Sequence, residues 1–401
     1  MSIKIFTDMI EPEAVAQIER IAALEAFKDA KIRIMPDVHA GKGCVCGFTA
    51  DLGDKVVPNL IGVDIGCGML TTEIGNVDID YNRLDQIIRQ KIPSGWHVRS
   101  ASIPLDENTA ERIDPLKCIA QITDGQIARF GLSLGTLGGG NHFIEIDVDR
   151  TGCKYLVVHT GSRNFGKVVC DYWQGVAYRR LMESVPSLRN MINDAKSTIS
   201  DPRSLPGMIE RMRQSHRRMC EVAEDNKELA FIEGPDREGY IHDMRIAQHW
   251  ARVNRESIAR IICSEMKFEV RAQFTTMHNY LGDDNIIRKS AISARAGEKV
   301  LIPLNMRDGS VLAVGKGNAD WNMSAPHGAG RLMSRSKAKA TISLEEYRKT
   351  MNGIWSSSVS METIDEAPLA YKPSERIIEQ IADTVDVIET IKPVYNFKAS
   401  T

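Results

Sequence analysis

The chain has 401 residues, 43% of them hydrophobic and 26% charged, with eight cysteines and a formal net charge of −2. This length and apolar content suffice for a sizeable core in one large domain or two, and the near-neutral charge excludes a general polyanion binder. The sequence has no apolar run of about 18 residues, which excludes an ordinary membrane-spanning helix, and no signal-peptide core, so we expect a cytoplasmic protein with reduced thiols.

The first predicted elements alternate between helix and strand. Residues 11–27 have apolar side chains at near-helical spacing and predict an amphipathic helix. Residues 31–35 then predict a short strand that Pro36 stops, and a glycine-rich stretch follows over 41–68. Residues 154–159 are apolar and β-branched, so they predict a buried strand that ends on a histidine.

The second half begins with a charged and mostly helical subregion over 172–266, broken near 200–206, which we expect on the outside of the fold. Short strands return over 286–314, a helix is predicted over 375–391, and a strand over 393–398. The alternation predicts an α/β or α+β fold in which irregular glycine-containing loops hold the functional groups.

Positive charge is concentrated in one segment. Residues 288–340 contain ten Lys or Arg against three Asp or Glu, a local charge of +7 that leaves about −9 on the remainder. Such a segment on a mildly acidic body fits a local phosphate or nucleic-acid site. A solvated basic face is the simpler explanation when charge alone is considered.

His327 lies in this basic segment and is followed by Gly328, Ala329 and Gly330. A nucleophilic histidine needs one unprotonated nitrogen and an acceptor that holds the other. If a helix begins near Gly328, Arg331 and Arg335 lie on one face of it, and its N-terminus and guanidiniums can face phosphates. The alternative is that His327 only caps that helix.

Five short runs place polar ligands close to glycines or loops: 36–39, 62–68, 140–145, 158–163 and 277–280. Their thiol, carboxylates and imidazoles suit Mn²⁺, Fe²⁺, Co²⁺ or Zn²⁺ better than Mg²⁺. Asp64 and Cys67 are three residues apart, so they could chelate one ion or bridge two. Singly, each run has a structural explanation, such as a buried Cys67, a hydrogen-bonded His159 or a turn at Asp37. The histidines at 97, 216, 242 and 249 lack such surroundings.

Seven motifs together resemble the RtcB family of RNA ligases. They cover residues 35–39, 62–69, 135–145, 159–163, 278–280, 288–297 and 327–331 and occur in the family's order. The resemblance extends over nearly the whole chain. It implies the RtcB-type α/β fold, with mixed β-sheets and surrounding helices, in a single catalytic domain over 1–401 that includes the helical subregion at about 172–266.

The resemblance implies a GTP- and Mn²⁺-dependent RNA ligase with two manganese ions. The family joins RNA 2′,3′-cyclic phosphate or 3′-phosphate ends to 5′-hydroxyl ends through a histidine–GMP intermediate and an activated RNA 3′-end. We therefore expect RNA as the partner, in repair of tRNA or other RNA, and an archease-like activator as a candidate second partner. The physiological RNA, the need for an activator and the oligomeric state stay open.

The resemblance also implies roles for particular residues. His327 matches the guanylylated histidine. The expected manganese ligands are Asp64, Cys67, His142, His159 and His278, with Cys67 in the bridging position. The expected nucleotide-binding residues are Asn141, Glu145, Asn305, His327, Gly328, Gly330, Tyr371 and Lys398. The arginines expected to contact RNA or phosphate are Arg163, Arg331 and Arg335.

The chain departs from the family pattern at two positions near the nucleotide. Asn305 replaces an expected serine, and Pro326 stands where a cysteine or serine often precedes the nucleophile. These departures leave the nucleotide preference open. Two other classes of function compete with ligation: a metal-dependent phosphoesterase that opens cyclic phosphates or removes 3′-phosphates, and a non-catalytic RNA-binding subunit. A covalent GMP adduct would distinguish the ligase from both.

Overall fold

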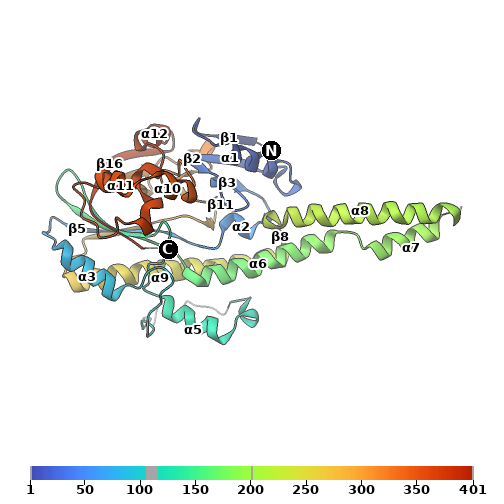
Figure 1. Ribbon diagram of the computed structural model, residues 1–401, viewed down its shortest axis with the longest axis horizontal. Coiled ribbons are helices and arrows are strands. Elements are labelled where there is room, and N and C mark those ends of the chain that lie inside the picture. The colour runs from blue at the N-terminus through green and yellow to red at the C-terminus, as the bar shows by residue number, and fades with distance from the viewer. Residues whose placement is uncertain (1, 105–115, 200–201, 400–401) are drawn as a thin grey trace.

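The computed structural model describes residues 2–104, 116–199 and 202–399, and its largest sheet has seven antiparallel strands in the order β13-β14-β16-β6-β7-β5-β9 (Figure 1). The strands are β5 Gly68–Gly75, β6 Phe143–Val148, β7 Lys154–Thr160, β9 Ala272–Met277, β13 Lys299–Asn305, β14 Gly309–Gly315 and β16 Val385–Lys398. The sheet curls until its edge strands meet, where the Leu301 N–H donates to Thr276 Oγ1 at 2.9 Å. The curled sheet therefore has an inner and an outer face, and each face packs against its own apolar cluster.

A second sheet has the order β1-β2-β3-β11-β10, in which β1 runs parallel to β2 and the other neighbours are antiparallel. Its strands are β1 Ser2–Ile5, β2 Lys31–His39, β3 Cys46–Asp51, β10 Tyr280–Leu281 and β11 Ile286–Lys289. Two short pairs complete the described strands: β4 Lys55–Val56 with β8 Ile232–Glu233, and β12 Ala291–Ser293 with β15 Ser324–Pro326. The fold class predicted from the sequence, mixed sheets with surrounding helices, is confirmed.

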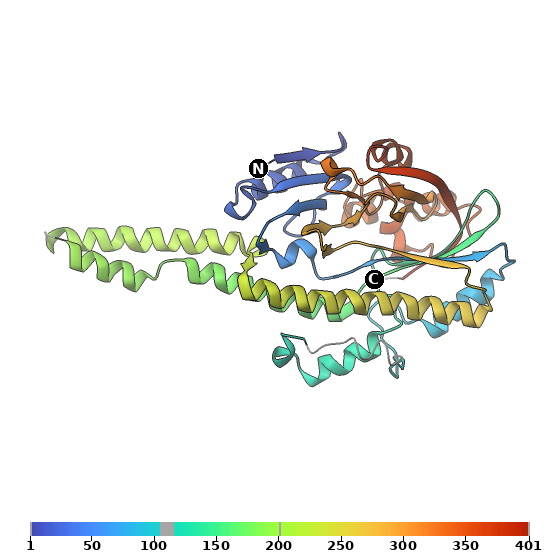
Figure 2. The ribbon, with the colours of Figure 1, turned by 180° about the vertical axis from the view of Figure 1, so that it is seen from behind.

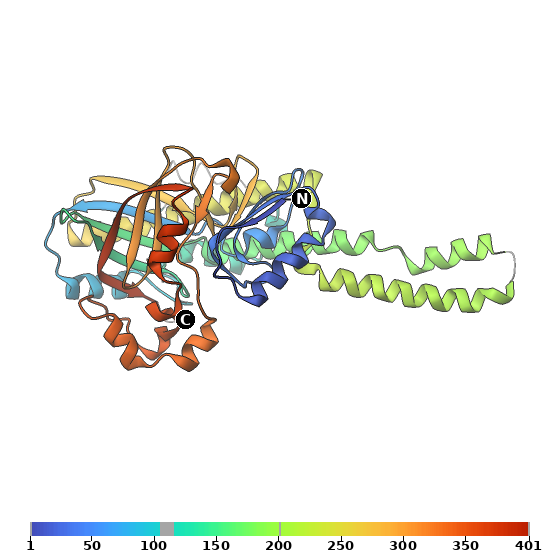
Figure 3. The same ribbon diagram turned by 90° about the horizontal axis from the view of Figure 1, so that it is seen from above.

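The helices cover the sheets from outside and extend beyond them (Figures 1 and 2). Their bounds are α1 Pro12–Ala22, α2 Pro58–Ile61, α3 Tyr81–Lys91, α5 Asp124–Ser133, α6 Arg163–Ser184, α7 Leu188–Thr198, α8 Leu205–Asp225, α9 Gly234–Met266, α10 Arg335–Thr341, α11 Leu344–Thr350 and α12 Ser374–Gln380. α6 and α9 lie side by side along one face, while α7 and α8 project as an arm (Figure 3). None of the described helices has the length and apolar character to span a membrane.

The core explains the positions of the central strands. On one face of the seven-stranded sheet, Ile144 of β6 and Val158 of β7 pack against Ile258 and Ile262 of α9. The inner face of the curled sheet holds a second cluster that includes Val157 of β7. Because successive strand residues point to opposite faces, both faces of β7 are apolar, which is why residues 154–159 read as a continuous apolar run.

Several predicted elements differ from the structure, and the first of them is the helix predicted over 11–27, which ends at Ala22. The strand β2 continues through Pro36 to His39, because its pairing with β3 is irregular between Ile34 and His39 and no regular ladder hydrogen bond is required of the proline. The late helix ends at Gln380 rather than at 391. Residues from Val385 onward instead form β16, which is hydrogen-bonded between β14 and β6. In the last two cases, the secondary structure of the segment is determined by the strands that pair with it.

Buried polar groups of α9 fasten the loops that surround the central strands. The side chain of Asn254 accepts from the backbone N–H groups of Gly135 and Thr136 at 2.7 and 3.1 Å and donates to the carbonyl oxygen of Gly161 at 3.1 Å. The neighbouring Arg255, only 1% exposed, donates to the carbonyl oxygens of Gly66 and Thr160 at 2.8 and 2.9 Å. One helix thus holds three glycine-containing loops in place.

Asn254→Ala should lower the free energy of unfolding by about 2–4 kcal/mol, because two buried backbone N–H groups lose their acceptor. Chemical denaturation of the purified protein measures this loss. Arg252→Ala, on the exposed side of the same helix, is the matched control and should change stability by less than about 0.5 kcal/mol. Equal stability of the Asn254 variant and wild type would contradict the fastening role.

Candidate active site

His327 is held by a carboxylate from the other end of the chain. Its Nδ1 lies 2.6 Å from Asp37 Oδ2, and its backbone N–H donates to the same oxygen at 3.2 Å. Asp37 is on β2 and is fully buried. A proton on Nδ1 that is donated to this carboxylate leaves the lone pair of Nε2 free, so the imidazole is oriented as a nucleophile.

Sequence reasoning missed this role of Asp37. The run over residues 36–39 pointed to a metal ligand or a turn, whereas in the structure Asp37 orients His327, and His39 lines the adjacent cavity with its Nδ1 2.9 Å from the Asp37 carbonyl oxygen. The sequence did require an acceptor for one nitrogen of His327. It gave no means of choosing a residue 290 positions away.

The chain after His327 is not a helix at first, so the condition of a helix near Gly328 is not met and His327 caps no helix there. Gly330 has a φ of 74° and lies so close to Asp37 that an added Cβ would collide with the carbonyl oxygen of Asp37. Arg331 then pairs with Tyr371 in an isolated bridge, and α10 begins only at Arg335. The close approach to β2 requires this irregular path.

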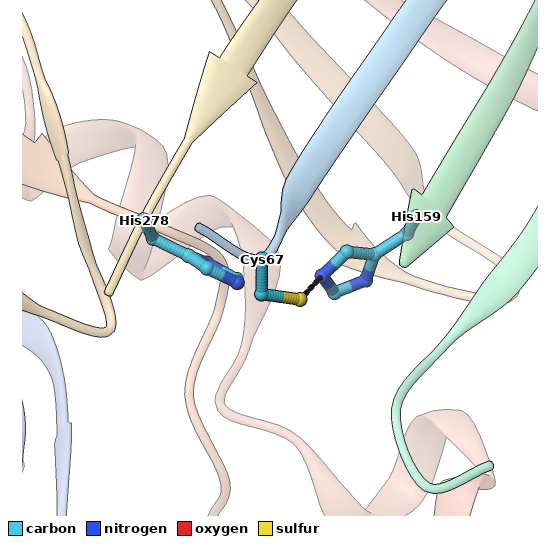
Figure 4. Close-up of side chains that lie close together, drawn as sticks. All are labelled: Cys67, His159 and His278. Carbon is cyan, nitrogen blue, oxygen red and sulfur yellow. Dashed lines mark hydrogen bonds between the residues drawn. The ribbon is translucent and has the colours of Figure 1, made fainter. Parts of the chain in front are cut away.

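Three of the predicted metal ligands come together because their strands are neighbours. Cys67 precedes β5, while His159 lies on β7 and His278 follows β9, the two strands on either side of β5 (Figure 4). The backbone N–H of His278 donates to the backbone carbonyl oxygen of Cys67 at 2.8 Å. Cys67 Sγ lies 3.4 Å from His159 Nε2, and one donor atom from each of the three residues lies within 4.8 Å of the others.

The remaining predicted ligands form a second group that shares the thiol. One donor atom each of Asp64, Cys67 and His142 lies within 4.8 Å of the others, with His142 Nε2 2.9 Å from Asp64 Oδ2 and 3.4 Å from Cys67 Sγ. Cys67 belongs to both groups, so the bridging position that the family resemblance implies stays a prediction for which the thiol is suitably placed. Gly161 makes room for Asp64, since an added Cβ there would collide with Asp64 Oδ1.

The donor set fits a divalent transition metal. His142 Nδ1 lies 2.8 Å from the Leu137 carbonyl oxygen, which orients the ring so that Nε2 faces the Asp64 carboxylate. Without a cation, a protonated Nε2 can donate to Asp64, and a cation that displaces this proton can bind both atoms. Among the described residues, the buried Nδ1 atoms of His159 and His278 also have no hydrogen-bond partner. A thiol, a carboxylate and three imidazoles suit Mn²⁺, Fe²⁺, Co²⁺ or Zn²⁺.

The surroundings of these groups favour the metal-binding form of the two histidines and of Asp64 but not that of the Cys67 thiol. Burial, together with neighbouring imidazoles, holds the pKa of His159 and His278 well below the usual range, so both are neutral as ligation requires. Burial and the Asp64 carboxylate raise the pKa of Cys67 well above its ordinary value. Burial opposes ionisation of Asp64, but the hydrogen bond and charge of His142 and the charge of Arg163 lower its pKa to about 2.

One cavity beside His327 contains the predicted nucleotide-binding residues. Its lining includes Asn141, Glu145, Asn305, His327, Gly328, Gly330, Tyr371 and Lys398. Glu145 projects into the cavity from β6, and Asn396 and Lys398 project from β16, which pairs with β6 in the sheet. The structure thus brings together residues separated by more than half of the sequence.

Glu366, which sequence reasoning did not single out, connects several of these residues. Its buried carboxylate accepts from Lys398 Nζ at 2.6 Å, from the Tyr371 hydroxyl at 2.6 Å and from Arg335 Nη1 at 2.5 Å. Arg331 Nη1 donates to it at 3.3 Å. Burial alone would raise the pKa of Glu366, but the surrounding Lys398, Arg335 and Arg331 lower it to about 2. Nothing in the surrounding sequence marks this glutamate as special.

The three predicted phosphate-binding arginines do not lie together. Arg331 and Arg335 line the cavity beside His327, and both are paired with Glu366. Arg163 lies in a separate groove whose lining also includes Asp64 and His142. Both hollows reach the metal-ligating cluster, because the cavity is lined by His159 and the groove by Asp64 and His142, and Asn141 lines both.

The departure at Asn305 has a structural explanation. Its Oδ1 accepts from the backbone N–H groups of Arg307 and Asp308 at 3.0 and 2.9 Å, and its Nδ2 donates to Asp308 Oδ2 at 2.8 Å. These bonds shape the tight turn between β13 and β14. Asn305 thus stabilises the cavity wall in addition to lining it.

The site combines a nucleophile, a cluster of metal-ligating groups and a polar cavity that adjoin one another. This combination defines a class of protein suited to metal-assisted transfer of a phosphate-containing group.

The family described as tRNA-splicing ligase RtcB matches residues 17–399. RNA-splicing ligase RtcB1 and RNA-splicing ligase RtcB, from two Escherichia coli strains, are each 30% identical over 98% of this chain and 96% of their own length. tRNA-splicing ligase RtcB of Aeropyrum pernix is 24% identical over 94% of this chain and 89% of its own. The chain belongs to the RtcB family.

Cation affinity should rise with pH, by about tenfold per unit if one proton is released, because the Cys67 thiol must lose its proton while His159 and His278 are already neutral. Calorimetric titration with Mn²⁺ between pH 6.5 and 8.5 measures this slope. Cys67→Ser should weaken binding at least about tenfold and flatten the slope. The control is Cys263→Ser, on α9 away from the cluster, and a wild-type affinity independent of pH would contradict the role of the thiol.

Proposed function

We propose that this protein is an RNA ligase that joins RNA 2′,3′-cyclic phosphate or 3′-phosphate ends to 5′-hydroxyl ends with GTP and Mn²⁺, in repair of tRNA or other RNA. The observation that carries the proposal is the pairing of His327 with Asp37 between a cavity and a metal-ligating cluster. The names of the family and of the relatives, RNA-splicing and tRNA-splicing ligase, support the same substrate class.

In the first step, His327 Nε2 attacks the α-phosphorus of GTP. A nitrogen–phosphorus bond forms, the bond from that phosphorus to the bridging oxygen breaks, and pyrophosphate leaves. Asp37 keeps the proton on Nδ1 throughout and stabilises the positive charge that the ring gains as Nε2 forms its fourth bond. The product is GMP held on His327.

In the second step, an oxygen of the RNA 3′-phosphate attacks the phosphorus of this GMP, the bond to His327 breaks, and an RNA–GMP anhydride forms. The RNA 5′-hydroxyl then attacks the RNA 3′-phosphorus, its proton passes to solvent, and GMP leaves as the phosphodiester forms. A cyclic phosphate end is first hydrolysed to a 3′-phosphate by water. Two Mn²⁺ held by Asp64, Cys67, His142, His159 and His278 would neutralise charge that develops on the phosphate oxygens.

The cavity offers complementary groups to a guanine. The Glu145 carboxylate, held by Asn396, can accept from the ring N–H and amino groups, and the Lys398 ammonium can donate to the ring oxygen. Glu366 keeps Lys398 in place through their 2.6 Å ion pair, and Arg331 and Arg335 add positive charge beside the phosphates. These assignments favour a guanine nucleotide over an adenine nucleotide, which lacks the ring oxygen.

His327→Ala should abolish transfer of label from α-labelled GTP to the protein, since the attacking nitrogen is removed, while Mn²⁺ binding persists. Denaturing gels of wild type and variant, before and after acid treatment, measure the adduct. His216→Ala, on the exposed arm, is the matched control and should label like wild type. If wild type takes no label with any divalent cation, with or without an archease-like activator, the ligase proposal fails and a phosphoesterase becomes the better assignment.

Asp37→Asn should slow guanylylation by about a hundredfold or more, because an amide can hold the wrong imidazole tautomer and cannot stabilise the charged ring. Single-turnover labelling with GTP measures the rate. Mn²⁺ affinity should stay within about threefold of wild type, since Asp37 belongs to neither group of metal ligands. An unchanged labelling rate would show that the Asp37 contact does not serve the reaction.

A further inference from the structure

Trp96 is the most exposed large apolar side chain among the described residues, at 84%. By contrast, Trp173, Trp250 and Trp321 are all buried. An indole that is left in water loses the free energy of burial, so its position calls for an explanation by function rather than by packing.

The backbone beneath Trp96 is fastened on several sides. The Gly95 N–H donates to the Gly138 carbonyl oxygen at 2.9 Å, and the carbonyl oxygen of Gly95 accepts from Arg163 Nη2 at 3.0 Å. The carbonyl oxygen of Trp96 accepts from Arg129 Nη2 at 3.2 Å. Gly138 lets the guanidinium of Arg163 lie close to this turn, because an added Cβ would collide with it. The exposed indole therefore rests on an anchored turn.

Trp96 lines the groove that ends at the metal-ligating cluster. The lining of the same groove also includes Asp64 and His142 and the cations Arg129, Arg163 and Lys167, of which Lys167 is paired with the exposed Asp171. Positive charge along a groove with an aromatic ring on its wall is the combination by which proteins hold single-stranded nucleic acid, with cations near the phosphates and the ring against a base.

We propose that Trp96 is a stacking platform for an unpaired base next to the reacting RNA end. The proposal rests on the proposed ligase function and adds a positioning residue to it. The ring holds the terminal nucleotide while the cations of the groove hold the phosphate backbone, so that the end enters at Asp64 and His142, opposite the cavity that takes the nucleotide. A protein partner is the competing occupant. The groove favours RNA because its lining combines the ring with three cations and also includes two of the predicted metal ligands, Asp64 and His142.

Trp96→Ala should raise KM for a short single-stranded RNA substrate at least about fivefold, since stacking of one base changes affinity by about 5- to 150-fold. Trp96→Phe should stay within about twofold of wild type because it keeps a ring. The matched control is Val222→Ala, which removes an exposed apolar side chain from the arm. Labelling of the protein by GTP, which needs no RNA, should be unchanged in all three variants.

Abasic substrates identify the stacked base. An abasic nucleotide is placed either at the 3′-phosphate end or at the 5′-hydroxyl end, and KM is measured with wild type and Trp96→Ala. At the end that Trp96 contacts, the abasic change should raise KM for wild type but add little for the variant, because the two changes remove the same contact.

Failure of this inference differs from failure of the ligase proposal. If wild type joins RNA and Trp96→Ala does so with the same KM, the stacking platform is wrong, and a role in contacting another protein takes its place. If Trp96→Ala loses GTP labelling to the same extent as RNA joining, the stacking platform is also wrong, because that result indicates a structural role for Trp96. If wild type neither labels nor joins, fluorescence anisotropy with labelled single-stranded RNA still decides, because the platform requires weaker binding by Trp96→Ala.

Discussion

The hydrogen bond between His327 Nδ1 and Asp37 Oδ2 is the contact on which the site depends. It joins β2 of one sheet to the segment that follows β15, and Gly330 must adopt a left-handed backbone for that segment to reach Asp37. The carboxylate is buried and fixed by the strand, so the imidazole has one orientation and one tautomer. His327 lies on an irregular stretch of chain, but its contact with a residue of a β-strand fixes the position of its imidazole.

The metal-ligating cluster depends on a different constraint, the order of strands in the curled sheet. Because β5 lies between β7 and β9, Cys67, His159 and His278 meet at one end of three neighbouring strands. Asn254 and Arg255 of α9 then hold the loops that carry Asp64 and His142 against this end. These buried side chains of the helix therefore help to position the donor atoms through the loop backbone, and their hydrogen bonds to that backbone offset part of the cost of burying them.

The cavity beside His327 and the groove lined by Trp96 both reach this cluster, and we propose that they take the nucleotide and the RNA end, respectively. On the cavity side, Glu366 gathers Lys398, Tyr371, Arg331 and Arg335 into one network of ion pairs and hydrogen bonds. Arg331 and Arg335, which the resemblance assigned to RNA or phosphate, are therefore neutralised in part by the buried Glu366 and line the cavity beside His327. Separate entrances suit the proposed reaction, in which the protein first takes up a nucleotide through the cavity and then transfers it to an RNA end bound in the groove.

By itself, the sequence determined the family, the α/β class, the buried strand over 154–159 and the donor residues, because periodicity, glycine-flanked motifs and ligand chemistry are local properties of the chain. It could not determine that Asp37 orients His327, that Glu366 organises the cavity, or that residues from Val385 onward form a strand. Each of these depends on partners far away in sequence, since hydrogen bonds and strand pairing are satisfied by whichever group the fold brings near. Only the tertiary structure decided which donor atoms lie close together and which arginines line the cavity beside His327.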